Sequence, residues 1–384
     1  MTVTAPKGFR AAGVACGLKS SGALDLALVV NDGPSRAAAA VFTTNRAKAH
    51  PVIWSQQVIA DGEVSAIVLN SGGANCFTGP EGFQTTHATA EFVAGMLDGV
   101  SAGDVLVCST GLIGEPLDRK KLLDGVAVAS QVLSADGGPD AARAIMTTDS
   151  VPKESQLSSS GWTIGGMAKG AGMLAPGLAT MLVVLTTDAE LTAAELDSAL
   201  REATRATFDR IDSDGCMSTN DTVALLASGA SGVRPDLEFF TTALRSVCAS
   251  LAEQLIHDAE GASHDIRIRV ESAATEADAV EVARSVARSN LFKAAMFGND
   301  PNWGRVLAAI GTTSAAFDPY AVDVSFNEVR LCHAGAPDRP RTEVDLTGRG
   351  IRVLIDLHAG DAEAEIYTND LTHDYVHENS AYAS

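Results

Sequence analysis

A threonine stands where a Gly/Pro-rich turn meets a strongly apolar run, in the segment KGAGMLAPGLATMLVVLTTD at 169–188. Thr180 directly precedes the run from Met181 to Leu185, whose β-branched residues predict a buried strand. If the chain were cut before Thr180, that residue would carry both a nucleophilic hydroxyl and a free α-amine. Such an amine has a pKa of ~7.7–8.0 and can act as a base near neutral pH. A threonine activated by its own amine is an established device for acyl transfer.

The same threonine has a simpler explanation, because threonine at a strand start often serves β-propensity or a turn hydrogen bond. The rest of the chain favours the chemical interpretation. The eight histidines are scattered, none of them flanks a G-x-S-x-G turn, and the H-E-x-x-H pattern of zinc proteases is missing from the sequence. With no side-chain base in a recognisable pattern, the α-amine of Thr180 is the better candidate.

Two glycine-rich loops follow predicted strands and can bring backbone close to a reacting group. The segment NSGGAN at 70–75 lacks the spacing of a nucleotide-binding loop, so we expect a tight turn there. The segment VCSTGLIG at 107–114 runs from a strand into a turn flanked by glycine. Such a turn can aim the Thr110 hydroxyl and the Gly111 N–H at one point, as an oxyanion hole requires. An ordinary strand-end turn is the competing interpretation.

Composition excludes several classes of function. The 384 residues carry 28 basic and 48 acidic side chains, a formal charge of −20. An acidic chain without a basic stripe is a poor partner for nucleic acid or anionic membranes. The longest apolar runs are too short to cross a bilayer, and the N-terminal segment lacks the apolar stretch of a secretory signal. The six cysteines show no zinc spacing, so we predict reduced core thiols, no metal site and a cytoplasmic protein.

Strand-like and helix-like segments alternate without a strict βαβ rhythm, which favours an α+β fold with layered sheets. Strands are predicted at Ala66–Leu69, Val105–Cys108, Met181–Leu185, Val223–Ala227, Ile266–Val270, Val322–Phe326, Ile351–Leu357 and Glu365–Tyr367. Helices are predicted behind the capping box Thr192–Glu195, from Phe240 to His257, and from Ala279 to Ala295. The segment SADGGPD at 134–140 has the composition of an exposed loop.

The length suggests about two domains. The softest boundary is the Gly-rich segment 229–235, so we place one lobe at 1–232 and a second α/β lobe at 233–384.

Several motifs, in order along nearly the whole chain, resemble those of ornithine acetyltransferase, the self-cleaving enzyme family of arginine biosynthesis. They are VFTTNR at 41–46, STGLIGE at 109–115, IMTTD at 145–149, KGAGMLAPGLATML at 169–182, STNDT at 218–222, DAEGA at 258–262, NWGR at 302–305 and DLT at 370–372. The resemblance implies a layered α/β/β/α sandwich of the N-terminal-nucleophile type, a smaller α/β lobe, and a C-terminal tail that returns to the active site.

The resemblance also implies a reaction. The precursor cuts itself between Ala179 and Thr180, giving chains 1–179 and 180–384. Thr180 then takes the acetyl group of N2-acetylornithine and passes it to glutamate in a ping-pong cycle. Thr110 and Gly111 match the oxyanion hole. No cofactor is implied, and the expected assembly is a heterotetramer of two α and two β chains.

Further positions match the substrate contacts of the family: Thr147, Lys169, Thr180, Glu260, Asn379 and Ser384. The chemistry fits an amino-acid substrate, whose carboxylate pairs with a lysine and whose ammonium group pairs with a glutamate. Thr148 is an alternative to Thr147 for the same contact.

Three alternatives stay open. Some members of the family accept only N2-acetylornithine, whereas others also use acetyl-CoA to make N-acetylglutamate. We favour the bifunctional type, with acetyl-CoA as a co-substrate. A self-processing aminopeptidase or amidase would use the same threonine with water as acceptor, and an interaction protein would use no chemistry at all.

Overall fold

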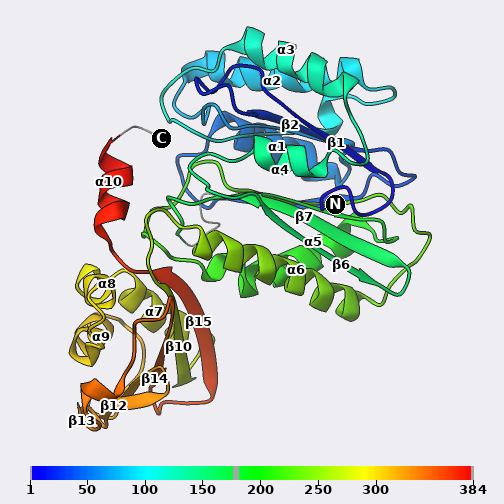
Figure 1. The fold of residues 1–384 in the computed structure, drawn as a ribbon. Helices are drawn as coiled ribbons and strands as arrows, with labels where there is room; N and C mark the ends of the chain where they lie inside the picture. The colour runs from blue at the N-terminus through cyan, green and yellow to red at the C-terminus, as the bar shows by residue number, and fades with distance from the viewer. Residues whose placement is uncertain (1, 176–180, 382–384) are drawn as a thin grey trace.

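The computed structural model describes residues 2–175 and 181–381, and its first lobe is built on two stacked sheets (Figure 1). The first sheet contains, in spatial order, β1 (Phe9–Val14), β2 (Leu26–Asn31), β4 (Ala66–Asn70) and β5 (Val105–Ser109). The second contains β3 (Ala38–Phe42), β9 (Thr222–Ala227), β8 (Leu182–Thr187), β7 (Trp162–Lys169) and β6 (Lys153–Ser159). Only the β4–β5 and β8–β9 pairs are parallel among these described strands.

Helices cover the outer faces of both sheets and fill the margins between them. They are α1 (His50–Val58), α2 (Gly79–Met96), α3 (Arg119–Gln131), α4 (Gly138–Ala144), α5 (Ala193–Ala206) and α6 (Leu237–His257). Apolar side chains of α2 and α3 pack on the first sheet, and those of α5 and α6 pack on the second. The order of layers is therefore helices, sheet, sheet, helices, which confirms the predicted sandwich.

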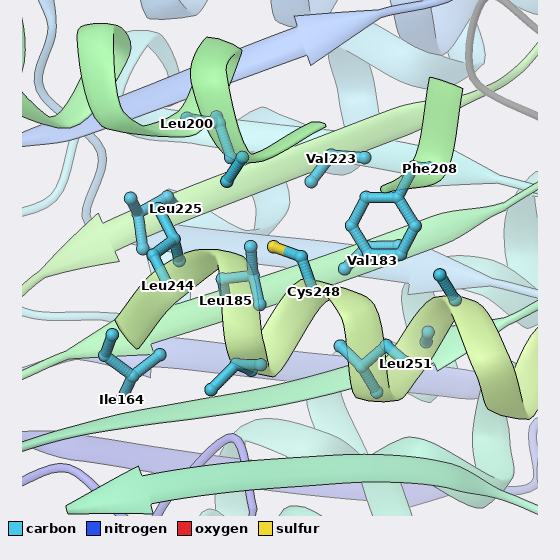
Figure 2. Close-up of a cluster of buried hydrophobic side chains, with 14 of the residues drawn as sticks. Ile164, Val183, Leu185, Leu200, Phe208, Val223, Leu225, Leu244, Cys248 and Leu251 are labelled. Carbon is cyan, nitrogen blue, oxygen red and sulfur yellow. The ribbon is translucent and has the colours of Figure 1, made fainter. Parts of the chain in front are cut away.

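Alternation along the strands explains why both sheets are buried on two faces. In β8, Leu182 and Val184 join the core between the sheets, whereas Val183 and Leu185 face α5 and α6. Successive side chains of a strand point to opposite faces, so an unbroken apolar run belongs to a central strand. Figure 2 shows the outer core, where side chains of β8 and β9 meet Leu200 of α5 and residues of α6.

A second lobe follows, with its own sheet and core. Its strands lie in the spatial order β13 (Ala336–Pro337), β12 (Val329–His333), β11 (Asp323–Phe326), β14 (Gly350–Asp356), β10 (Asp265–Ala273) and β15 (Ala362–Asn369). Helices α7 (Glu276–Ala287), α8 (Asn290–Phe297) and α9 (Trp303–Ile310) contribute to its core. Helix α10 (His373–Ala381) leaves this lobe and extends back toward the sandwich (Figure 1). Short 3₁₀ turns lie at Ile59–Asp61, Ala102–Asp104, Phe208–Arg210 and Arg341–Glu343.

Three predicted boundaries differ from the structure. The predicted helix 279–295 is two helices, because the Ser289 side chain caps α8 by accepting from the Phe292 N–H. The expected loop at 134–140 ends inside α4, whose first turn contains Pro139, a residue well suited to that position.

The lobe boundary predicted at 232–233 also differs from the structure. Helix α6 follows the Gly-rich segment but buries Phe240, Leu244 and Leu251 in the sandwich core, so the change of core comes between Ala259 and Ile266. The glycines at 229 and 232 adopt positive φ and make a turn rather than a linker. None of the helices within 2–175 and 181–381 combines the length and apolar character needed to cross a membrane.

We expect Leu251→Ala to lower the free energy of unfolding by about 2–5 kcal/mol, because its fully buried side chain leaves a cavity between α6 and the sheet. Urea unfolding followed by circular dichroism measures the change. Arg245→Ala, on the exposed side of the same helix, is the control and should change stability by less than about 0.5 kcal/mol. An unchanged urea midpoint for Leu251→Ala would contradict this account of the core.

Candidate active site

A cavity of about 300 Å³ lies where loops of the sandwich meet Glu260 and the C-terminal helix. The volume is at the small end of the range for ligand sites, and suits a compact metabolite. Its lining is contributed by segments that are distant in sequence. The lining residues are Ala74, Thr110–Ile113, Thr147, Thr148, Lys169, Gly172, Met173, Ser218–Asn220, Glu260 and Asn379. Five predicted site residues that lie far apart in the sequence, from Thr110 to Asn379, are therefore brought together with Gly111.

The turn after β5 is shaped by a close approach of two glycine loops. The Gly73 N–H donates to the Thr110 carbonyl at 2.9 Å. Gly111 has a φ of +124°, and a Cβ built on it would lie 2.8 Å from the Gly73 nitrogen. Glycine is therefore required at 111 both for its backbone conformation and for space. The predicted tight turn at 70–75 is what holds the Thr110–Gly111 turn in place.

Lys169, at the end of β7, contacts the hydroxyl of that turn. Its ammonium group donates to Thr110 Oγ1 at 3.1 Å, and the residue is only 2% exposed. Because the hydroxyl accepts from Lys169, its own hydrogen remains available to donate into the cavity. Burial lowers the pKa of Lys169, and the neighbouring Asp149 carboxylate opposes that shift.

Asp149, the last residue of the motif IMTTD, is central to the site, although the sequence pattern alone did not indicate its role. Its Oδ1 accepts from Lys153 Nζ at 2.7 Å and from the Gly170 N–H at 2.7 Å, and its Oδ2 accepts from the Thr147 N–H at 2.9 Å. Burial alone would raise the pKa of Asp149, but the ammonium groups of Lys169 and Lys153 outweigh it and lower the pKa to about 2. Asp149 is thus an ionised carboxylate between two buried lysines.

Both candidate threonines border the cavity, in different ways. Thr147 is tied to Asp149 through its N–H, with its hydroxyl 3.5 Å from the same carboxylate oxygen. Thr148 donates its hydroxyl to Glu260 Oε1 at 2.7 Å. Thr148 therefore orients the predicted substrate-binding glutamate, while Thr147 lies beside it in the cavity wall.

Glu260 is held from three sides. In addition to Thr148, Asn379 of α10 donates to Glu260 Oε2 at 2.9 Å, and the Glu260 N–H donates to the Ala171 carbonyl at 3.0 Å. A Cβ at Gly172 would lie 2.4 Å from Glu260 Oε2, so glycine is needed where this carboxylate crosses the loop. Through this contact, Asn379 of α10 forms part of the cavity wall.

Three predicted residues lie outside the described part of the chain: Ala179, Thr180 and Ser384. Met181 is the first described residue after Thr180, and it contacts a residue next to the cavity lining. Its N–H donates to Asp221 Oδ1 at 3.1 Å, and Asp221 follows Asn220 of the cavity wall. Within residues 2–175 and 181–381, no group of three or more His, Cys, Asp or Glu side chains is arranged to hold a metal ion.

We expect Asp149→Asn to lower the free energy of unfolding at pH 7 by about 2–3 kcal/mol, because the pKa of Asp149 is lower in the folded protein than in the unfolded chain. A depressed carboxyl pKa stabilises the fold above about pH 4, and this stabilisation is lost as the pH falls toward about 2. The difference between variant and wild type should therefore shrink across that window in urea unfolding. Asp124→Asn, at an exposed pair with Lys120, is the control and should match wild type throughout. A loss of equal size at pH 7 and near pH 2 would contradict the assignment.

Comparison with known proteins identifies the family of the chain. A model of the ArgJ family matches residues 10–384. The arginine biosynthesis bifunctional protein ArgJ of Streptomyces coelicolor is 62% identical over 384 residues, covering 100% of both chains, and that of Thermobifida fusca is 58% identical with the same coverage. A solved structure of ornithine acetyltransferase complexed with ornithine from Mycobacterium tuberculosis is 58% identical, covers 47% of this chain and 96% of that chain, and has a TM-score of 0.45. The match of the family model and the identity to these relatives over the full length establish that the chain belongs to the ArgJ family.

Proposed function

We propose that this enzyme moves the acetyl group of N2-acetylornithine to glutamate through an acetyl ester on Thr180. The observation that carries the proposal is the gathering of Thr110, Gly111, Lys169, Glu260 and Asn379 at one cavity, by segments far apart in sequence. Family membership supports it, because the curated relatives are named as bifunctional proteins of arginine biosynthesis.

The proposed first step is self-cleavage between Ala179 and Thr180, which gives Thr180 a free α-amine. The amine then takes the proton of the Thr180 hydroxyl as Oγ attacks the acetyl carbonyl. The tetrahedral oxyanion accepts hydrogen bonds from the Thr110 hydroxyl and the Gly111 N–H. The donation from Lys169 Nζ to Thr110 Oγ1 at 3.1 Å suits this role, since it turns the hydroxyl hydrogen toward another acceptor and adds positive charge behind it.

Collapse of the intermediate breaks the amide C–N bond, and the protonated α-amine supplies the proton that ornithine needs to leave. The acetyl group now forms an ester with Thr180 Oγ. The amine of glutamate attacks that ester, the C–O bond breaks, and the threonine hydroxyl regains its proton. The cycle is a ping-pong reaction because ornithine leaves before glutamate reacts.

The charged residues of the cavity indicate where the ammonium group and the carboxylate of the amino-acid substrate bind. Glu260 is 8% exposed, and its two oxygens accept one hydrogen bond each, from Thr148 and from Asn379. Because each carboxylate oxygen can accept two hydrogen bonds, Glu260 can also bind an ammonium group. Lys169 uses one ammonium hydrogen on Thr110 and can offer another to a carboxylate. Thr147 lies in the same wall, and Ser384 completes the proposed set of contacts.

The proposal extends to acetyl-CoA as a second acetyl donor, which would make the enzyme bifunctional. It also includes a cytoplasmic heterotetramer of two 1–179 and two 180–384 chains, carried over from the family resemblance. All six cysteines of the chain fall among the described residues and are free thiols, as a reducing compartment maintains them.

We expect Thr180→Ala to remain a single intact chain and to lose acetyl transfer, because both the attacking oxygen and the cleavage step depend on that hydroxyl. Intact-mass spectrometry and an assay of ornithine release provide the two measurements. Thr187→Ala, in the last residue of β8, removes a buried threonine hydroxyl from the sheet and should still be cleaved and active. Turnover by Thr180→Ala would refute the nucleophile.

The donor and acceptor are tested with N2-acetylornithine or acetyl-CoA, each with and without glutamate. We expect N-acetylglutamate from both donors, and a trapped acetyl-Thr180 peptide when glutamate is omitted. If glutamate is acetylated by N2-acetylornithine but not by acetyl-CoA, the enzyme is a monofunctional transferase. Continuous ornithine release without glutamate, and no N-acetylglutamate, would instead identify an amidase.

A further inference from the structure

Two residues of the motif STNDT at 218–222 lie side by side next to the candidate site. Asn220 and Asp221 lie directly before β9, where that strand runs parallel to β8. One of the two contacts the oxyanion turn, and the other contacts the first described residue after Thr180. The pair therefore joins the two parts of the site that the proposed reaction must bring together.

Asn220 holds the two loops that form the oxyanion turn. Its amide nitrogen donates to the Ser109 carbonyl at 2.8 Å and to the Ala74 carbonyl at 2.6 Å, while the Thr219 hydroxyl donates to its oxygen. Ser109 is the residue before Thr110, and Ala74 follows Gly73 in the facing glycine loop. A single buried amide side chain thus bridges the two loops that form the turn at Gly111.

Asp221 holds the nucleophile side. Its Oδ1 accepts from the Met181 N–H at 3.1 Å, and its backbone carbonyl accepts from the Thr43 N–H at 3.0 Å in the neighbouring strand connection. The Thr222 N–H donates to the Met181 carbonyl at 3.2 Å. Met181 is consequently fixed on both its N–H and its C=O by two consecutive residues, although it stands one residue before β8 begins.

The state of the Asp221 carboxyl is unusual. The residue is fully buried, and its Oδ2 has no hydrogen-bond partner among the residues that the structure describes. Burial raises the pKa of Asp221 well above its usual value, although the nearby Ser218 hydroxyl, the Met181 N–H and the ammonium group of Lys169 oppose this shift. A neutral carboxyl can accept from an amide without the cost of burying an unpaired charge.

We propose that Asp221 is a positioning residue for Thr180: by accepting the Met181 N–H, it fixes the residue that directly follows the nucleophile in the chain, beside the Asn220 side chain that holds the oxyanion turn. This inference rests on the proposed function, in which Thr180 attacks and Thr110 and Gly111 stabilise the oxyanion. It adds a residue that does not contact the substrate. Because displacing a reacting atom by about 1 Å can cost ~100-fold in rate, such a contact controls kcat rather than substrate binding.

The test compares Asp221→Ala, which removes the acceptor, with Asp221→Asn, which keeps a neutral oxygen at the same place. For Asp221→Ala we expect slow self-cleavage by intact mass and a fall in kcat of about 100-fold in the cleaved fraction. The KM for N2-acetylornithine should stay within about twofold, because Lys169 and Glu260 are untouched. Asp221→Asn should restore both cleavage and kcat to near wild type.

Asn31→Ala is the matched control for lost stability. Asn31 is fully buried and donates to the Ala227 carbonyl at the other end of β9, so its loss should lower the melting temperature without changing cleavage or kcat. If Asp221→Ala does not fold, Asp221→Ser replaces it in the test. The serine hydroxyl oxygen lies one bond closer to the backbone than Asp221 Oδ1, so it does not reach the position that accepts the Met181 N–H. Equal kcat for the Asp221 variant and Asn31→Ala would overturn the inference. Failure of Asp221→Asn to rescue would also overturn it.

Thr180→Ala, measured alongside, separates this inference from the proposed function. If Thr180→Ala is still cleaved and active, the proposed nucleophile is wrong and Asp221 has nothing to position. If Thr180→Ala is inert while Asp221→Ala cleaves and turns over normally, only the role of Asp221 is refuted.

Discussion

The ammonium group of Lys169 is buried, and the arrangement of the site depends on compensating it. A buried charge is tolerated only when it is paired and hydrogen-bonded. Asp149 provides the main opposite charge and is itself shared with Lys153, which also pairs with Asp258 at 2.5 Å. The result is a chain of alternating charges that runs from Lys169 at the cavity through the buried Asp149 and Lys153 to the partly buried Asp258 after α6. Each member is costly to remove because its neighbours would be left unpaired.

The carboxylates of this charge chain also position the backbone around the cavity by accepting hydrogen bonds from N–H groups. Asp149 accepts from the N–H groups of Thr147 and Gly170, so a single carboxylate sets one wall of the cavity and the exit of β7. Asp258 accepts from the Ser150 N–H at 2.9 Å and lies two residues before Glu260. The position of Glu260, and through it the docking of Asn379, therefore follows from how the buried lysines are neutralised.

The sequence predicted the parts of the site that depend on local pattern. The Thr110–Gly111 turn follows from glycines after a strand, and strands β8 and β9 follow from unbroken apolar runs. The roles of Asp149 and Asp221 could not be predicted, because each depends on partners that the fold brings together from other elements. The lobe division was misplaced for a similar reason, since a Gly-rich turn resembles a linker until the burial of α6 is known. The position of Thr180 relative to the cavity remains a prediction, because that residue lies outside the described part of the chain.

The topology explains why a cut before Thr180 is compatible with a stable enzyme. The second sheet combines β3, β6 and β7 from residues 1–179 with β8 and β9 from residues 180–384, and β8 lies between β7 and β9. Lys169 pairs with Leu182 across β7 and β8, while Leu182 pairs with Thr222 across β8 and β9. Breaking the connection between β7 and β8 therefore removes no strand pairing. The two chains also share the core between the sheets and the core beneath α5 and α6, so they would separate only if both of these cores were opened. Such a fold can tolerate a cut before Thr180 because the hydrogen bonds of Met181 to Asp221 and Thr222 do not depend on the connection from β7.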